Sequence, residues 1–122
     1  MIVVDRQKLK DMQSIIHHNY WYWGDSYIII LDKGKATVQL GINNENKDCG
    51  IIYTLSVASY YRGKGYGNLL LEACENLAKH LKLSQICLYV EKDSEALNWY
   101  MRHNYKKDKY RSKYLFRLVK DL

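Results

Sequence analysis

The stretch YYRGKGYGNLLLEACENLAK, residues 60–79, sets three glycines on alternate positions directly in front of a helical pattern. The three are Gly63, Gly65 and Gly67, and they enclose Lys64 and follow Arg62. A helix N-terminus offers unpaired N–H groups and the positive end of the helix dipole. Glycine lets the backbone turn with positive φ and lets an anion approach closely. The stretch therefore predicts a phosphate- or pyrophosphate-binding loop that opens a helix.

The pattern after the loop places apolar residues on one helical face. Leu70, Cys74, Leu77 and Leu81 follow the spacing i, i+4, i+7 and i+11,. Outward from this helix, apolar and β-branched runs predict strands at residues 2–4, 27–31, 36–42, 50–57, 85–91 and 113–119,. Further helices are expected at 6–18 and, capped by Asp93 or Ser94, up to residue 103, with a turn at 32–35 and a loop at 43–48,. This order predicts an α/β domain with a single mixed central sheet and flanking helices.

The glycine spacing excludes two familiar phosphate loops. A Walker loop requires GxxxxGK followed by Ser or Thr, and the chain contains no such run,. The dinucleotide fingerprint requires GxGxxG, whereas the spacing here is GxGxG, and a hairpin precedes it,. A plain turn with a helix cap remains the alternative explanation at this point.

The length of the chain and its composition favour one domain over residues 1–122,. No apolar run approaches the ~18 residues of a membrane span. The N-terminus lacks the basic-then-apolar layout of a secretory signal, so a cytoplasmic setting is expected,. The cysteines, Cys49, Cys74 and Cys87, contain no CxxC pair, which predicts free buried thiols and no metal site,.

The net charge of +6 is concentrated near the C-terminus. The cations there are Arg102, Lys106, Lys107, Lys109, Arg111 and Lys113, with Tyr105, Tyr110 and Tyr114 among them. A solvated basic edge is the commoner outcome of such a run. A small nucleic-acid-binding domain is the less favoured alternative.

Two blocks of sequence resemble the GNAT superfamily of acyl-CoA N-acyltransferases. Arg62 to Gly67, RGKGYG, matches the R/Q-x-x-G-x-G/A loop of this family, and LSVASYY before it resembles its L-x-V-x-P-x-Y strand end. The second block resembles N-x-x-A-x-x-L-Y-x-x-x-G-F, and reads Asp93, Ala96, Trp99, Tyr100, Asn104 and Tyr105 at those positions. The resemblance covers about residue 27 to the C-terminus. The region before it is short for the family.

The resemblance implies a mostly antiparallel sheet in which two strands splay apart to admit acetyl-CoA as co-substrate. The loop would hold the pyrophosphate of coenzyme A, and strand 50–57 would bind its pantetheine arm through backbone groups. The implied cofactor-binding residues are Leu55, Val57, Arg62, Gly63, Lys64, Gly65, Tyr66, Gly67 and Asn68.

Tyr100 matches the family tyrosine that lies near the thioester sulfur, which implies a catalytic role as proton donor,. Many relatives carry a glutamate as general base on the strand before the loop, and residues 49–53 contain none. Asp48, Glu45, His17, His18 and relay through water stay open for this task.

The resemblance thus implies an N-acetyltransferase that acts by direct attack of a primary amine, on a small molecule or on a protein. A non-catalytic acyl-CoA-binding relative is the alternative, because the base is missing. The aromatic residues 20–23 are candidates for the acceptor pocket, and the final strand could form the edge of a homodimer.

Overall fold

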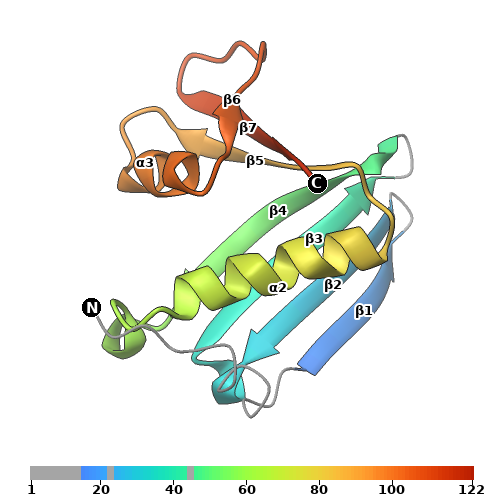
Figure 1. Cartoon of the computed structure of the whole chain (residues 1–122), viewed down its shortest axis with the longest axis vertical. Coiled ribbons are helices and arrows are strands. Elements are labelled where there is room, and N and C mark those ends of the chain that lie inside the picture. The colour runs from blue at the N-terminus through green and yellow to red at the C-terminus, as the bar shows by residue number, and fades with distance from the viewer. Residues whose placement is uncertain (1–14, 22–23, 44–45) are drawn as a thin grey trace.

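The computed structural model describes residues 15–21, 24–43 and 46–122, and its helices and strands are shown in Figure 1. The strands are β1 (Ile15–Trp21), β2 (Gly24–Leu31), β3 (Ala36–Asn43), β4 (Asn46–Val57), β5 (Gln85–Glu91), β6 (Lys106–Lys107) and β7 (Leu115–Asp121). The α-helices are α2 (Tyr66–His80) and α3 (Glu95–Arg102). No helix in these ranges is long and apolar enough to cross a membrane.

The strands form one seven-stranded sheet in the order β1-β2-β3-β4-β5-β7-β6. All neighbours pair antiparallel except β4 and β5, which are parallel and are joined by the crossover through α2. The predicted single mixed sheet, mostly antiparallel, is therefore confirmed.

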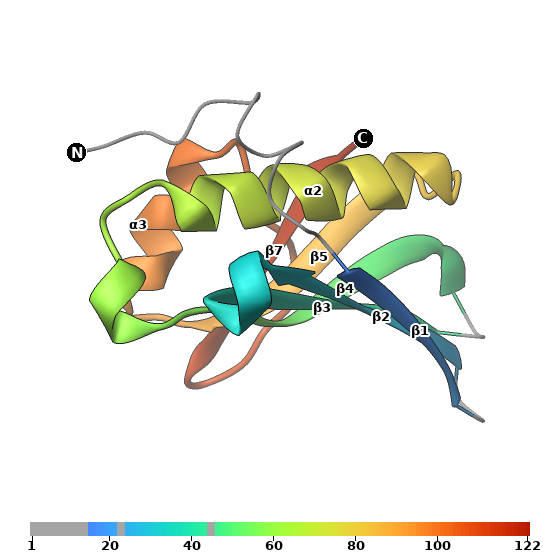
Figure 2. The same cartoon turned by 90° about the horizontal axis from the view of Figure 1, so that it is seen from below.

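The helix α2 lies over one face of strands β2 to β4, as Figure 2 shows from the side. Its predicted face is buried: Leu70 and Cys74 are fully covered, and Leu77 and Leu81 pack against the core. Inward-pointing residues of alternate strand positions, such as Val38 and Ile86, meet this face,. Burial of such apolar side chains supplies the main driving force for the fold.

The parallel pair β4 and β5 is short, and this shapes the site. Pairing runs only from Cys49, opposite Gln85, to Ile51, opposite Cys87. Beyond these residues β4 continues to Val57 and β5 to Glu91 without pairing to each other, so the two strands splay apart in a V. The predicted splayed strand pair is confirmed.

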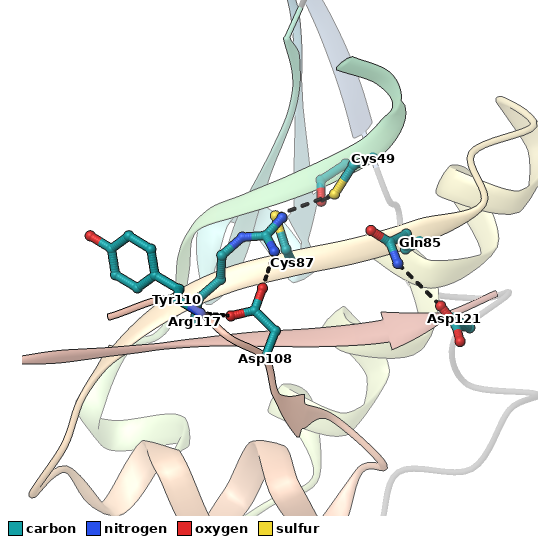
Figure 3. Close-up of polar contacts among 8 residues, drawn as sticks. Cys49, Gln85, Cys87, Asp108, Tyr110, Arg117 and Asp121 are labelled. Carbon is teal, nitrogen blue, oxygen red and sulfur yellow. Dashed lines mark hydrogen bonds and ion pairs between the residues drawn. The ribbon is translucent and has the colours of Figure 1, made fainter. Parts of the chain in front are cut away.

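Two buried thiols lie at the base of this V. The sulfurs of Cys49 and Cys87 are 3.3 Å apart, and Arg117 on β7 lies between them and Asp108 (Figure 3). The thiol of Cys49 donates to Cys87, and this bond together with the nearby guanidinium lowers the Cys87 pKa to about 7. The same shared proton raises the pKa of Cys49. All three cysteines are free and buried, as predicted.

Several predicted boundaries were wrong. The helix predicted at 6–18 is contradicted at its C-terminal end, because residues 15–18 belong to β1 and pair with β2; residues 6–14 and the strand predicted at 2–4 lie outside the described part. β4 begins at Asn46, inside the predicted loop 43–48. The final strand, predicted at 113–119, both begins and ends two residues later. The short strand β6 was not predicted.

Candidate active site

The edge of β4 that faces the V is not paired to β5 beyond Ile51. The N–H of Ala58 donates to Lys35 O on the β3 side at 2.8 Å. Because the peptide bond is trans, the C=O of Val57 points the opposite way, into the V. Strands repeat every two residues, so the C=O of Leu55 faces the same way. An open strand edge of this kind can accept an extended ligand as an additional strand.

The glycine loop follows this edge and turns into α2. Gly63 and Gly65 have φ of +76° and +90°, a region that other residues adopt only with strain,. The Nε–H of Arg62 donates to Val57 O at 3.1 Å and so closes the loop onto the end of β4. A Cβ on Gly63 would meet no atom within 4 Å, so glycine is needed at this position for its positive φ and not for lack of space.

The N-terminus of α2 is open to a ligand. Gly65 occupies the cap position without a side-chain hydrogen bond, and the first turn contains no acidic residue. The first helical bond runs from Leu69 N to Gly65 O at 3.2 Å, so the N–H groups of residues 66–68 have no carbonyl one turn back,. These donors and the helix dipole favour an anion here.

The side chain of Tyr66 anchors the loop to the sheet. Its OH donates to Asp32 Oδ2 at 2.6 Å, and Lys35 Nζ lies 3.0 Å from the same oxygen. The Tyr66 hydrogen bond and Lys35 hold the pKa of Asp32 below its ordinary value, whereas the carboxylate raises the pKa of Tyr66. Tyr66, one of the residues expected to bind the cofactor, thus also holds the loop in place through its hydrogen bond to Asp32.

A cavity of about 870 Å³ joins these features. The predicted residues that line it are Leu55, Val57, Arg62, Gly63, Gly65, Tyr66, Gly67, Asn68 and Tyr100. Lys64 does not line it; its Nζ lies over the rings of Tyr60 and Tyr61, at 5.0 and 5.5 Å from their centroids. The structure therefore gathers residues from β4, the loop, α2 and α3 around one space.

The helix α3 forms the opposite wall of the cavity. Ser94 caps it, since its Oγ accepts from Ala96 N at 3.0 Å, and this decides between the two predicted caps. Trp99 packs on Gly67: a Cβ there would lie 3.3 Å from the Trp99 ring. Gly67 therefore permits close approach of the two helices. Tyr100 is 8% exposed, and burial, followed by the nearby Cys74, raises its pKa to about 12.

Side chains of α3 that were not predicted as site residues also line the cavity. They are Glu95, Ala96, Trp99, Arg102 and His103. His103 on α3 contacts Asn68 on α2 directly, with Nε2 2.8 Å from Oδ1. The helical spacing from Ala96 through Trp99 to His103 was a signal that could have found this face.

None of the described candidates for the general base lines the cavity. His17 and His18 lie on β1, three strands away from β4, which places them roughly 14 Å across the sheet,. Asp48 is exposed at the start of β4, where its C=O accepts from Ser84 N at 2.8 Å. Glu45 lies outside the described residues.

The predicted acceptor aromatics are only partly described. Tyr20 is 79% exposed on β1 and its ring lies against His18, while residues 22–23 and the side chain of Trp21 lie outside the description. Within the described ranges, no group of three or more metal-ligating side chains gathers.

The geometry of a splayed strand, a glycine loop and an open helix N-terminus has a counterpart among known families. The profile of the acetyltransferase (GNAT) domain matches residues 19–107. The chain belongs to the GNAT family. No curated protein sequence gives a significant match to it.

Solved structures show the same GNAT fold. The chain is similar to the IAA acetyltransferase from Bacillus cereus, at 17% identity and a TM-score of 0.68, covering 90% of this chain and 100% of that one. It is also similar to the PaiA N-acetyltransferase from Thermoplasma acidophilum in complex with coenzyme A, at 18% identity and a TM-score of 0.67. That match covers 80% of this chain and 60% of the other. A GNAT acetyltransferase from Streptococcus pneumoniae is similar at 16% identity and a TM-score of 0.65, over 82% of this chain and 68% of the other. At these identities the likeness establishes the fold.

Proposed function

We propose that residues 1–122 form one GNAT-type domain that transfers an acetyl group from acetyl-CoA to a primary amine. One observation carries the proposal. The edge of β4 that β5 leaves free and the open N-terminus of α2 line the same cavity of about 870 Å³. A ligand with a strand-like amide arm and a pyrophosphate at its end matches this pair of features.

The residues present fit coenzyme A by the chemistry of their donors. The N–H groups at the start of α2, with Arg62 beside them, suit the pyrophosphate,. The backbone groups of Leu55 and Val57 suit the amides of the pantetheine arm, which would lie along β4 as an added strand. When bound, acetyl-CoA supplies an acyl group activated as a thioester.

The chain itself contributes polarisation, a proton and position. Backbone N–H groups along the open edge of β4 can donate to the acyl oxygen and stabilise negative charge there. The OH of Tyr100 is protonated at neutral pH and lines the cavity, where it can donate its proton to a departing thiolate,. Burial raises its pKa to about 12, which makes it a weaker acid than an exposed tyrosine. Holding both partners in one cavity supplies proximity, which favours direct attack in a ternary complex.

The decisive experiment has two stages. The first measures the melting temperature with acetyl-CoA and with free adenosine as a control; a saturable rise with acetyl-CoA alone is expected. The second follows release of free thiol from acetyl-CoA with a panel of small amines and peptide amines. No stabilisation by acetyl-CoA at saturating concentration would refute the proposal.

A non-catalytic acyl-CoA-binding relative is the second candidate, because none of the described base candidates lies at the cavity. This candidate predicts stabilisation by acetyl-CoA without thiol release for any amine across the alkaline range. Thiol release that rises with pH, as the free amine becomes available, would exclude it and support relay of the proton through water.

A further inference from the structure

Asn68 and His103 form a bridge between the two helices that wall the cavity. Asn68 lies in the first turn of α2, and His103 is the C-terminal cap of α3. The Nδ1 of His103 is 2.7 Å from Trp99 O, and its Nε2 is 2.8 Å from Asn68 Oδ1. Both residues are half-buried and both line the cavity.

The contacts of His103 restrict where its protons lie. A backbone carbonyl only accepts, so Nδ1 carries a proton in every state. Nε2 then has two choices. As imidazolium, His103 donates from Nε2 to Asn68 Oδ1; as neutral imidazole, Nε2 accepts from the amide nitrogen of Asn68 after a half-turn of the amide. The oxygen and nitrogen of an amide occupy equivalent places, so one bridge satisfies both states.

The two states present different surfaces to a ligand at the start of α2. With His103 charged, the NH₂ of Asn68 is released as a donor and the cavity gains one positive charge. With His103 neutral, Asn68 turns its carbonyl oxygen outward. A pyrophosphate is stabilised by donors and cations and repelled by an outward oxygen, so the two states differ in their affinity for it.

Other charged groups act on the pair from each neighbouring element. The cations are Arg62 on the loop and Arg102 on α3, and the carboxylate on α3 is Glu95; all three line the cavity. On α2, Glu72 lies one turn beyond Asn68 and takes part in an interaction of its own. A bound anion adds negative charge at close range and so favours the imidazolium, whereas the positive charges of the two arginines disfavour it.

We propose that the His103–Asn68 bridge couples proton uptake to pyrophosphate binding: the bound anion holds His103 as imidazolium and Asn68 as donor. The inference rests on the proposed function, because it takes the pyrophosphate of coenzyme A as the ligand at this site. By linkage, binding that takes up a proton becomes weaker as the pH rises.

Calorimetry of the full chain tests this with dephospho-CoA, which lacks the 3′-phosphate whose own titration would confuse the proton count. Titrations in HEPES and in Tris at one pH separate the binding heat from the heat of buffer ionisation. We expect net uptake of up to one proton per site on binding to the wild type. The dissociation constant should rise with pH by up to about tenfold per unit.

Matched variants assign the proton to its residue. His103→Gln retains a side-chain donor that does not titrate, so it should bind with no proton uptake and a flat pH profile. Asn68→Ala, which leaves His103 intact, should lower the uptake as well. His80→Gln, an exposed histidine at the far end of α2, should match the wild type.

The imidazole nitrogen signals provide a second measurement that does not depend on affinity. The signal lost in His103→Gln should show both nitrogens protonated when dephospho-CoA is bound. Equal uptake in the wild type and His103→Gln, or a neutral His103 in the complex, would overturn the inference while the proposed function stands. No binding heat with either dephospho-CoA or acetyl-CoA would overturn both.

Discussion

The two walls of the cavity bind in different ways. The wall formed by β4, the glycine loop and the start of α2 presents backbone groups, whose directions are set by strand pairing and by positive φ at Gly63 and Gly65. The wall formed by α3 presents side chains, among them Trp99, Tyr100 and His103. The binding properties of the backbone wall depend on the positions where positive φ requires glycine. Those of the side-chain wall depend on which functional groups project from the helix face. We therefore expect mutations in the first wall to alter cofactor affinity, and mutations of Tyr100 in the second wall to alter turnover.

Tyr100→Phe tests the side-chain wall and carries the largest expected effect. Loss of the proton donor should lower kcat by roughly 100-fold and leave the affinity for acetyl-CoA nearly unchanged. Tyr114→Phe, at an exposed tyrosine on the connection to β7, is the control. Steady-state kinetics and calorimetry provide the two numbers. An unchanged kcat would remove Tyr100 from the chemistry.

The raised pKa of Tyr100 adds a pH dependence. The folded pKa of about 12 exceeds the ordinary value of 10.0, so the folded state binds the proton more tightly than the unfolded state. Its contribution to stability is present below pH 10 and is lost as the pH rises from 10 toward 12,. Chemical denaturation of the wild type and Tyr100→Phe should therefore show stabilities that change in parallel up to pH 10 and diverge above it.

Gly65→Ala tests the backbone wall against a matched glycine. Gly65 and Gly34 both have φ of +90°, so an added Cβ should cost each about 1–2 kcal/mol of stability,. Gly34 lies on the turn between β2 and β3, where a Cβ meets nothing within 4 Å. We expect Gly65→Ala to lose at least about tenfold in acetyl-CoA affinity, worth about 1.4 kcal/mol, and Gly34→Ala to lose none. Equal dissociation constants in the two variants would contradict a backbone role for the loop.

The difference between the walls also explains what could be predicted from the sequence. The glycine loop, the start of α2 and the Ser94 cap depend on local backbone preferences, so a few neighbouring residues are enough to predict each of them. Their placement around one cavity followed from the family resemblance. Trp99 and His103 were missed as site residues, because their importance arises only when α3 packs against α2.

The errors at the N-terminal edge have the same origin. Ile15 and Ile16 continue a helical spacing from Leu9 and Met12, yet residues 15–21 pair in register with β2. Partner strands decide between a helix and a strand when a short segment fits both patterns. β4 begins early for a related reason: Asn46 pairs with Asn43 across a register shift that no local pattern marks.

Tyr66→Phe tests the hydrogen bond that anchors the loop of the backbone wall. It removes the bond to Asp32 that ties the loop to the turn between β2 and β3, and should cost about 1.5 kcal/mol because the acceptor is charged,. Urea denaturation measures this, with Tyr60→Phe, at an exposed ring, as the control. The folded pKa of Asp32 lies below 3.8, so the bond contributes above that pH and its contribution is lost as the pH falls through the folded value,. A difference between wild type and variant that persists in acid would place the lost stability elsewhere.

The base of the V, where the backbone wall begins, provides the smallest effect and the finest test. Cys87 has a pKa of about 7, chiefly because the Cys49 thiol donates to it, whereas burial raises the pKa of Cys74 to about 12. Ultraviolet thiolate absorbance should therefore show one transition near pH 7, and Cys49→Ala should move it upward because the donor is gone. Cys74→Ala should leave it in place. If Cys49→Ala left the transition unchanged, Arg117 alone would account for it, and the contact between the two strands at the base of the V would be looser than 3.3 Å between the sulfurs implies.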